Sequence, residues 1–462
     1  MTGPSGASGP SGPSGASGSS GPSGPSGASG PSGASGPSVG RLGDGPRPSS
    51  PGVRVVLDAR PLQAPDRAPL AAAYLEGLLG AFDANPLSGE SFAFLIASDL
   101  DDPTVRFAHL AVVGRRHLPP TRLLRSGALT LDPFVLRGAS LGATWRAERA
   151  GAAGAVYHAV GGGPLPIASG LPVVVTLLDL APWELPDAFQ RSVASRFGQR
   201  LRGQLLREAA AVIVGSEATA RAARRVLRIR RDRLRVVRLA PRVGFGPTSS
   251  PASSGAMAVR ERLGLSGRYL VFSGRFDARL DLSTMLEALA ALTATGRPSG
   301  LDDGVPWPPR ILLVGASPDD RASIARAAAR KGVGGSLAYA PALPVPDVVE
   351  LVRAARGAVL PVLSEGAGLP VIEALACGTP VVASSVGPLP ELVGPAGLLV
   401  APRDAGGLAV ALAAIWADDA VHDQIASNAR GRAGRDRRSW ADVARETRAI
   451  YAEVGVRARA NA

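Results

Sequence analysis

The sequence predicts an α/β protein of two doubly wound, Rossmann-like domains that face each other across a cleft, with a disordered tail at the N-terminus. Short runs of Val, Ile and Leu alternate with Ala-, Leu- and Arg-rich segments in two successive series. This alternation is typical of parallel strands joined by crossover helices. The 462 residues are enough for two cores. Ligands of such sheets bind beyond the carboxyl ends of the strands, so we expect a site in the cleft.

The N-terminal tail is predicted to cover residues 1–50. Residues 3–38 repeat the triplet Gly-X-Ser, mostly with Pro or Ala at X. Glycine at every third residue is the collagen pattern, but this run is short and has serine where hydroxyproline would stabilise a triple helix. The composition therefore favours a flexible tail. A trimerising triple helix is the alternative.

The first domain is predicted to cover residues 52–246. It opens on a buried strand at Val53–Asp58, which a helix with apolar spacing follows at Ala71–Phe82. A polar stretch, Pro247–Ala256, is interpreted as the linker to the next domain. Further strands of the first domain are expected at Phe92–Ala97, Ala155–His158, Val173–Leu177 and Ala211–Val214.

The second domain is predicted to cover residues 257–439, and a C-terminal helix over 440–456 follows it. Its strands are expected at Tyr269–Phe272, Arg310–Val314, Ala358–Leu363, Pro380–Ala383 and Gly397–Val400. Its helices are expected at Ser283–Ala294, Asp319–Lys331, Pro346–Ala355 and Pro370–Cys377. The Pro- and Gly-rich stretch 296–309 between two of these elements is expected to be a surface insertion.

Composition excludes several classes of protein. The single cysteine, Cys377, excludes a disulfide framework. One cysteine and four scattered histidines do not form a structural metal site. The N-terminus has no basic segment followed by an apolar one, and no apolar run is long enough to cross a bilayer. These features predict a cytoplasmic protein.

The formal net charge of +13 rests almost entirely on arginine, since Lys331 is the only lysine. Arginines are densest over residues 191–242, with a peak at 228–233. Such a patch could hold the protein at the inner face of an anionic membrane or bind acidic acceptors. A solvated helix face is the alternative. Nucleic acid is not expected as a partner, because no aromatic side chains alternate with the arginines.

The most informative pattern lies in residues 363–380. A buried strand runs into a loop with Glu365, Gly366 and Gly368, and the two glycines would let the backbone approach a ligand closely. Pro370 suits the first position of the helix that follows. The N–H groups and the positive dipole end at the start of that helix would bind a phosphate.

Glu373 is expected in the first turn of this helix, where its carboxylate could accept hydrogen bonds from vicinal hydroxyl groups. Together with Glu365 it would flank the anion-binding backbone. The arrangement suits a ligand that contains a sugar, a diphosphate and a ribose. Favourable charge at a helix start is the alternative explanation for Glu373, because short motifs also match by chance.

These residues resemble a known family. Glu365 and Glu373, separated by seven residues within Glu-Gly-Ala-Gly-Leu-Pro-Val-Ile-Glu, resemble the signature of the family 4 retaining glycosyltransferases of the GT-B fold. Phe272–Asp277 resembles the strand-end Gly-Arg motif of that family. The first half is similar at 53–61, 176–186 and 214–217, and residues 439–451 resemble the family's closing helix, which crosses back onto the first domain.

The resemblance implies transfer of a sugar from a nucleoside-diphosphate sugar with retention of configuration, without metal or cofactor, to a glycan, lipid or small-molecule acceptor. Glu365 would contact the donor sugar near the scissile bond, Glu373 would bind the ribose hydroxyls, and Arg275 would hold the diphosphate. A surface ion pair with Asp277 or Asp281 is the alternative for Arg275. The implied catalytic candidates are Glu365 and Asp179. The implied donor-binding candidates are Gly274, Arg275, Arg279, Gly366, Ala367, Gly368, Leu369 and Glu373.

Three positions depart from the family pattern. Leu280 stands where the family usually has a second phosphate-binding lysine, with Arg279 beside it. Leu178 precedes Asp179 where the family often has histidine, and the other histidine of this half, His158, matches a different position. The first loop, residues 67–74, lacks glycine. Because one lost transition-state donor can cost about two to three orders of magnitude in rate, a catalytically silent relative that binds a nucleotide sugar or a protein is the alternative. A sugar-nucleotide epimerase is a third.

Overall fold

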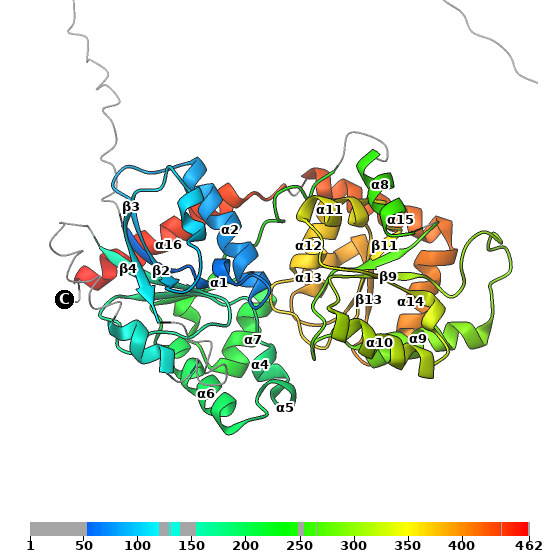
Figure 1. Cartoon of the computed structure of the whole chain (residues 1–462), viewed down its shortest axis with the longest axis horizontal. Coiled ribbons are helices and arrows are strands. Elements are labelled where there is room, and N and C mark those ends of the chain that lie inside the picture. Colours follow the sequence, from blue (N-terminus) through cyan, green and yellow to red (C-terminus); the bar gives the residue numbers. More distant parts are fainter. Residues whose placement is uncertain are drawn as a thin grey trace, which may run out of the picture. The chain divides into compact units, whose positions relative to one another are not determined.

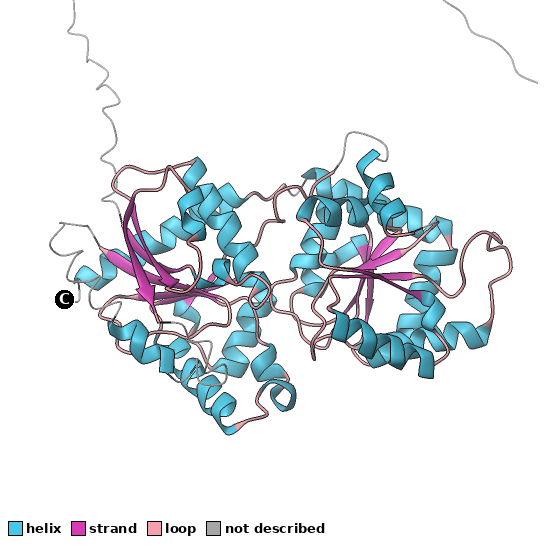
Figure 2. Ribbon diagram, viewed as in Figure 1, coloured by secondary structure: helices cyan, strands magenta, loops and turns pink. Residues whose placement is uncertain are grey.

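The computed structural model describes residues 53–119, 129, 131–138, 154–247, 254–265, 267–435 and 437–460 (Figure 1). The predicted tail at 1–50 lies outside these residues. The described chain forms two parallel β-sheets, each with helices on both faces (Figure 2). The predicted class of two doubly wound α/β sheets is therefore confirmed.

The first sheet has seven strands among the described residues, in the order β3-β2-β1-β4-β5-β6-β7, and every neighbouring pair is parallel. The strand order reverses between β1 and β4, which creates the crevice where such sheets bind ligands. The strands are β1 Arg54–Asp58, β2 Ser91–Ala97, β3 Val112–Leu118, β4 Ala155–Val160, β5 Val173–Thr176, β6 Ala211–Val214 and β7 Leu234–Val236. Its helices are α1 Arg60–Gln63, α2 Pro69–Ala84, α4 Ala181–Glu184, α5 Pro186–Phe189, α6 Val193–Glu208 and α7 Glu217–Leu227.

The second sheet has six strands among the described residues, in the order β10-β9-β8-β11-β12-β13, and it is also parallel. Its reversal falls between β8 and β11. The strands are β8 Leu270–Phe272, β9 Ile311–Val314, β10 Leu337–Ala340, β11 Gly357–Leu360, β12 Val381–Ser384 and β13 Gly397–Val400. Its helices are α8 Ser254–Arg262, α9 Leu282–Thr295, α10 Pro318–Arg330, α11 Val345–Ala354, α12 Leu369–Ala376, α13 Leu389–Val393, α14 Ala405–Ala417 and α15 Asp419–Arg435.

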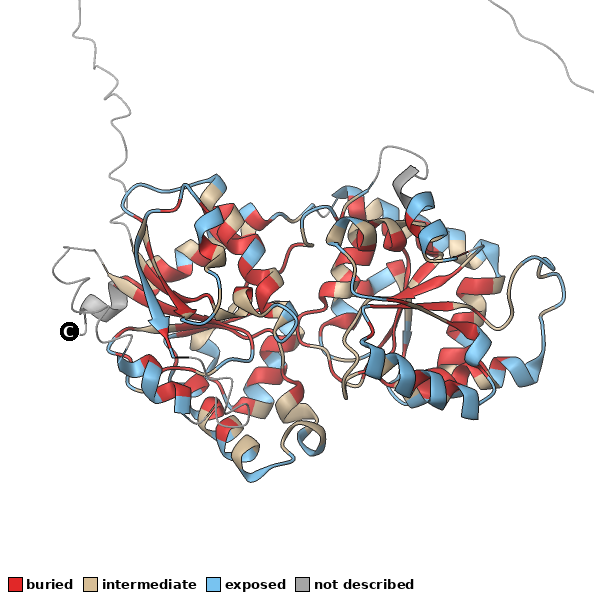
Figure 3. Ribbon diagram, in the orientation of Figure 1, coloured by how far each residue is buried: buried red, intermediate tan, exposed pale blue. Residues whose placement is uncertain are grey.

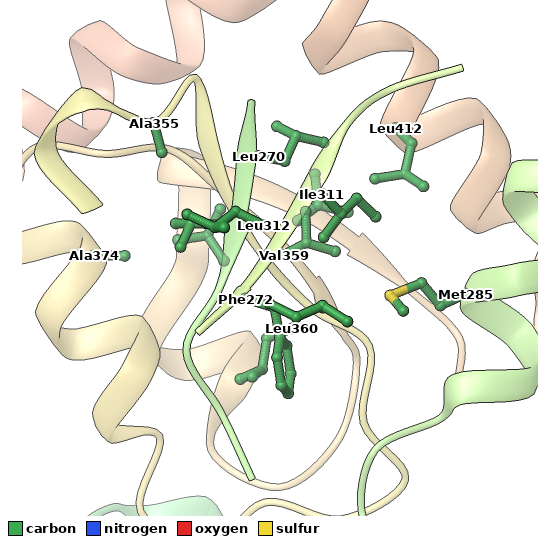
Figure 4. Packing of buried hydrophobic residues seen from close by; sticks show 14 of the residues in the cluster. Leu270, Phe272, Met285, Ile311, Leu312, Ala355, Val359, Leu360, Ala374 and Leu412 are labelled. Carbon is green, nitrogen blue, oxygen red and sulfur yellow. The ribbon is translucent and has the colours of Figure 1, made fainter. Parts of the chain in front are cut away.

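The central strands are buried on both faces (Figure 3). In the second sheet, Leu312 and Val359 pack among side chains from the covering helices, including Met285 of α9 and Leu412 of α14 (Figure 4). Burial on both faces explains why these strands consist of continuous Val, Ile and Leu runs that were visible in the sequence.

Three strands, β3, β7 and β10, were not predicted. All three lie at sheet edges. An edge strand is covered on fewer sides, so it tolerates polar residues and loses the apolar run; β3 contains Gly114, Arg115, Arg116 and His117, all exposed. The predicted linker at 247–256 was too long, because α8 already begins at Ser254.

The C-terminal helix, α16 (Trp440–Ala460), packs against α2 of the first sheet. The Trp440 ring meets Tyr74 edge to face with 5.5 Å between centroids, and its indole N–H donates to the Pro241 carbonyl at 2.9 Å. Further along, the Tyr451 hydroxyl lies 2.7 Å from Nδ1 of His158. The last helix is thus anchored on the first domain by buried aromatic contacts.

The Gly77→Ala substitution tests this anchoring. A Cβ at position 77 would lie within 2.6 Å of Trp440 Cζ2, so the α16 contact would have to open. We expect a loss of about 2–3 kcal/mol in the free energy of unfolding, measured by urea denaturation. The matched control is Gly80→Ala, one turn further on α2, where a Cβ meets nothing within 4 Å. Alanine there should be neutral or stabilising by up to about 1 kcal/mol. Equal effects at both positions would contradict the packing argument.

Candidate functional site

A cavity of ≈ 180 Å³ lies beyond the carboxyl ends of β8 and β11. It is bounded by the start of α2, the segment after β8, the loop after β11 and one side of α12. The cavity brings together six predicted site residues: Gly274, Arg275, Arg279, Glu365, Leu369 and Glu373. The other predicted candidates, Asp179, Gly366, Ala367 and Gly368, are not among the residues that line it.

Glu365 is held by the loop that follows β11. Its Oε1 accepts hydrogen bonds from the backbone N–H groups of Ala367 at 3.1 Å and Gly368 at 2.8 Å. Burial raises the pKa of Glu365, and the charge of Asp179 adds to this; the two N–H groups and Arg279 offset the rise only in part. The carboxyl group is therefore fixed in place with Oε2 left for other partners.

The start of α12 differs from the prediction in two respects. The helix begins at Leu369, so Pro370 is its second residue, and Glu373 lies beyond the first turn. Gly368, at φ +68°, precedes the helix in a left-handed conformation that favours glycine. The amides of Ala367 and Gly368, expected to bind a ligand anion, donate instead to Glu365.

Glu373 is only 2% exposed and forms a two-pronged ion pair with Arg242. Arg242 Nε donates to Oε1, and Nη2 donates to Oε2 at 2.9 Å. The guanidinium also lies over the Phe245 ring, 5.1 Å from its centroid. Burial raises the pKa of Glu373, and the hydrogen bonds from Arg242 oppose that rise. Arg242 was not among the predicted site residues, because the sequence pattern places it only in the arginine-dense region 191–242.

The two arginines after β8 share Asp277. Arg275 Nε donates to Asp277 Oδ2 at 3.1 Å, so the ion pair considered for Arg275 is present. Arg279 donates to both oxygens of Asp277, and its Nη1 reaches Asp179 Oδ2 at 2.7 Å. Asp179 thereby links the first sheet to Arg279, and it also accepts the Ala181 N–H. Both guanidinium groups line the cavity.

Gly366 is in direct contact with the first domain. A Cβ at this position would lie 2.7 Å from Asp179 Cα and closer still to the Leu178 carbonyl oxygen. Its own carbonyl accepts a hydrogen bond from the Thr219 hydroxyl at 2.8 Å. The absence of a side chain at Gly366 therefore allows the loop after β11 to approach the backbone of Leu178 and Asp179 closely. The sequence had predicted a close approach to a ligand at this glycine.

The positions that depart from the family pattern carry no polar group into the cavity. Leu280 is buried in the core of the second sheet, and Leu178 is buried in that of the first. His158 sits in the core between Thr176 and Tyr451, and burial lowers its pKa to about 3, so it is neutral. The glycine-free first loop forms the start of α2, and its Pro69, Leu70 and Ala73 give the cavity an apolar wall.

The arginine-dense region 191–242 divides into internal and exposed residues. Arg202 is 2% exposed and donates to the Gly161 and Gly163 carbonyls, while Arg235 pairs with Glu453. Arg202 and Arg235 thus bind groups within the protein, as Arg242 does beside the cavity. Six of the exposed arginines line an open depression at the end of α7: Arg221, Arg224, Arg225, Arg228, Arg230 and Arg231.

The described residues contain no group of three or more His, Cys, Asp or Glu side chains that could hold a metal ion. In the same part of the chain, no helix combines the length and the apolar composition that crossing a membrane requires.

The match to a sequence family falls on the domain that holds this site. Residues 267–418 match the family described as Glycosyl transferases group 1. This part of the chain is thus similar to the glycosyltransferases of group 1. The O-antigen chain mannosyltransferase B of Escherichia coli is 30% identical over 223 residues, which are 48% of this chain and 54% of that protein. The chain thus spans about half the length of this curated relative.

Solved structures match over both sheets. Sucrose-phosphate synthase from Thermosynechococcus elongatus superposes with a TM-score of 0.61 at 21% identity, over 87% of this chain and 98% of that one. Anabaena HepE in complex with UDP-glucose gives a TM-score of 0.60 at 17% identity, over 87% and 99% of the two chains. The described chain thus has the GT-B fold, as the resemblance implied.

The Arg242–Glu373 pair yields a prediction for stability. Arg242→Ala leaves a buried carboxylate without its partner, and we expect a loss of about 2 kcal/mol at pH 8, at the low end for such pairs because the Arg242 side chain is 30% exposed. The pKa of Glu373 is already raised by burial and should rise further in the variant. A raised pKa in the folded state favours folding at low pH, so the deficit should shrink as the pH falls toward 5.

The control is the double variant Arg242→Ala/Glu373→Gln, which removes both charges and should recover most of the loss at pH 8. Urea denaturation of the four proteins at pH 5 and pH 8 gives the complete cycle. An Arg242→Ala deficit that does not depend on pH, or no recovery in the double variant, would contradict the ion-pair argument.

Proposed function

We propose that the chain is a glycosyltransferase that moves a sugar from a nucleoside-diphosphate sugar to an acceptor with retention of configuration and without a metal ion. The observation that carries the proposal is the composition of one cavity. It combines two carboxylates, Glu365 and Glu373, with three guanidinium groups, Arg242, Arg275 and Arg279. A sugar joined to a nucleoside diphosphate would use both the carboxylates, through its hydroxyl groups, and the guanidinium groups, through its diphosphate.

The roles follow from charge. As the bond between the sugar carbon and the diphosphate oxygen breaks, negative charge develops on the diphosphate and positive charge on the sugar ring. Arg275 and Arg279 would stabilise the leaving diphosphate, with Arg279 substituting for the cation that Leu280 cannot supply. Glu365 would face the positive sugar carbon, and Glu373 would accept the ribose hydroxyls. Asp179 would act through Arg279 by holding its guanidinium.

Donor binding needs changes at the Arg242–Glu373 pair and in the cavity itself. A ribose diol must share or replace the Arg242 hydrogen bonds to Glu373, since both carboxylate oxygens accept from Arg242. The volume of ≈ 180 Å³ is also below the roughly 300–1,000 Å³ of typical small-molecule sites. We therefore expect the donor to widen the cavity by moving the start of α2 away from α12.

The experiment is calorimetric titration of the full chain with UDP-, GDP- and ADP-sugars, repeated with Glu373→Ala. The HepE complex with UDP-glucose makes UDP-sugars the first donors to try. Binding of one nucleotide class that is lost in Glu373→Ala, followed by turnover of that donor, supports the proposal. Binding without turnover against any acceptor would favour the catalytically silent relative. No binding by a protein that melts cooperatively would end the proposal.

The exposed arginines around α7 are the remaining candidate for contact with a membrane. We propose that the cluster Arg221–Arg231 holds the protein on anionic lipid, near a lipid-linked acceptor. The test is co-sedimentation with phosphatidylglycerol vesicles at 20 and 300 mM salt, with phosphatidylcholine vesicles as reference. Arg224→Gln/Arg225→Gln/Arg228→Gln should abolish binding, while Arg326→Gln/Arg330→Gln on α10 should not. Absence of binding even at low salt would rule the contact out.

A further inference from the structure

A second cavity of ≈ 670 Å³ lies on a different side of α12 from the candidate donor site. The two cavities use different faces of this helix. Leu369, Pro370 and Glu373 line the first, and Ile372, Leu375 and Ala376, spaced i, i+3 and i+4, line the second. The volume of the second cavity falls within the range of small-molecule sites, roughly 300–1,000 Å³.

Both chain connections between the two sheets line this second cavity. Leu239, Pro241 and Phe245 come from the segment that leads from β7 toward α8, and Arg438, Ser439 and Asp442 come from the segment that enters α16. The floor is apolar, because Leu239, Phe245 and Leu375 present buried side chains to it. An apolar floor of this kind needs a partner with an apolar body.

The rim of the cavity is strongly basic. Four arginines line it, and its one lining carboxylate, Asp442, caps α16 through Ser439 and pairs with Arg445. Arg438 is bound to Glu446 through both of its terminal nitrogens. Within the described part of the chain, the exposed side chains of Arg238 and Arg437 have no hydrogen-bond or ion-pair partner. Two guanidinium groups are therefore available to a ligand anion.

We propose that this cavity binds an amphiphilic anion, a molecule with an apolar chain or ring and one phosphate or carboxylate group. The apolar body would lie on Leu239, Phe245 and Leu375, and Arg238 and Arg437 would take the head group by charge-assisted hydrogen bonds. The two free cations beside an apolar floor distinguish this occupant from a neutral apolar molecule and from free phosphate. The proposal does not depend on the donor chemistry of the first cavity.

The test uses octyl phosphate below its micellar concentration, titrated into the full chain by calorimetry, with inorganic phosphate and 1-octanol as reference ligands. We expect octyl phosphate to bind at least about tenfold more tightly than either reference, because only it uses both the floor and the rim. Arg238→Gln/Arg437→Gln should weaken its binding about tenfold or more. Ala376→Phe, which fills the cavity from α12, should abolish binding.

The matched control is Arg326→Gln/Arg330→Gln, which removes the same charge from the exposed face of α10 and should leave binding unchanged. Equal affinity for octyl phosphate and inorganic phosphate, an equal loss in the control, or full binding by a cooperatively folded Ala376→Phe would overturn the proposal. The arginine variants are on the surface, so they keep the test valid if Ala376→Phe does not fold. A dimer in sedimentation that Ala376→Phe dissociates would also overturn it, since a second copy would then cover the cavity.

Discussion

Glu365→Gln is expected to lower kcat for sugar transfer by about 10²–10³ while the protein stays folded. The amide oxygen of Gln can still accept from Ala367 and Gly368, which hold Oε1 of the native side chain, so the loop should keep its shape. What disappears is the negative charge beside the sugar carbon that becomes positive as the donor bond breaks. The loss should therefore appear in kcat, with little change in KM for the donor.

The sign of the effect on stability separates this charge loss from misfolding. Burial raises the pKa of Glu365, so its ionised form is unfavourable in the folded protein, and the contribution of the group to stability falls as the pH rises through that raised pKa. Glu365→Gln should therefore be no less stable than the native protein at pH 8. Glu287→Gln, on the exposed side of α9, is the control with unchanged activity. An active Glu365→Gln enzyme would exclude the proposed role.

Gly366→Ala is expected to produce the second large effect, through geometry alone. The new Cβ would lie 2.7 Å from Asp179 Cα and nearer to the Leu178 carbonyl oxygen. Both obstacles are backbone, so a side-chain rotation cannot relieve the clash. The loop after β11 must move away from the first domain and lose the hydrogen bond from Thr219 to the Gly366 carbonyl. We expect a loss of about 2–3 kcal/mol in unfolding free energy and at least tenfold weaker donor binding.

Urea denaturation and calorimetry of the donor check the two parts of this prediction. Gly335→Ala is the control, since a Cβ there meets nothing within 4 Å and the backbone is not in the left-handed region. If Gly366→Ala is as stable as the native protein and binds the donor normally, the two backbones can separate without loss of free energy. The close approach at Gly366 would then not be required for donor binding.

The burial of Leu178 and Leu280 explains why these two positions do not contribute polar groups to the cavity. Both side chains are buried in apolar cores, so neither position could add a polar group to the cavity without unfavourable burial. The cations of the site come from other places in the chain: Arg279, one residue before Leu280, and Arg242, which lies 131 positions from Glu373 in the sequence.

The sequence by itself determined the parts of this protein that depend on local periodicity. The central strands of both sheets are continuous apolar runs because they are buried on both faces, and such runs are visible without a structure. The spacing of Glu365, Gly368 and Glu373 placed the loop and helix of the site for the same reason, since a strand, a glycine turn and a helix start have local signals.

Only the tertiary structure decided which groups meet across the cavity. Arg242 with Glu373, Arg279 with Asp179, and Gly366 with Leu178 are contacts between residues a hundred or more positions apart. No periodicity encodes such pairs, because they depend on the packing of whole elements rather than on the conformation of one. The edge strands β3, β7 and β10 were missed for a related reason. They are partly exposed and carry no clear burial pattern, so only their backbone hydrogen bonds to β2, β6 and β9 define them.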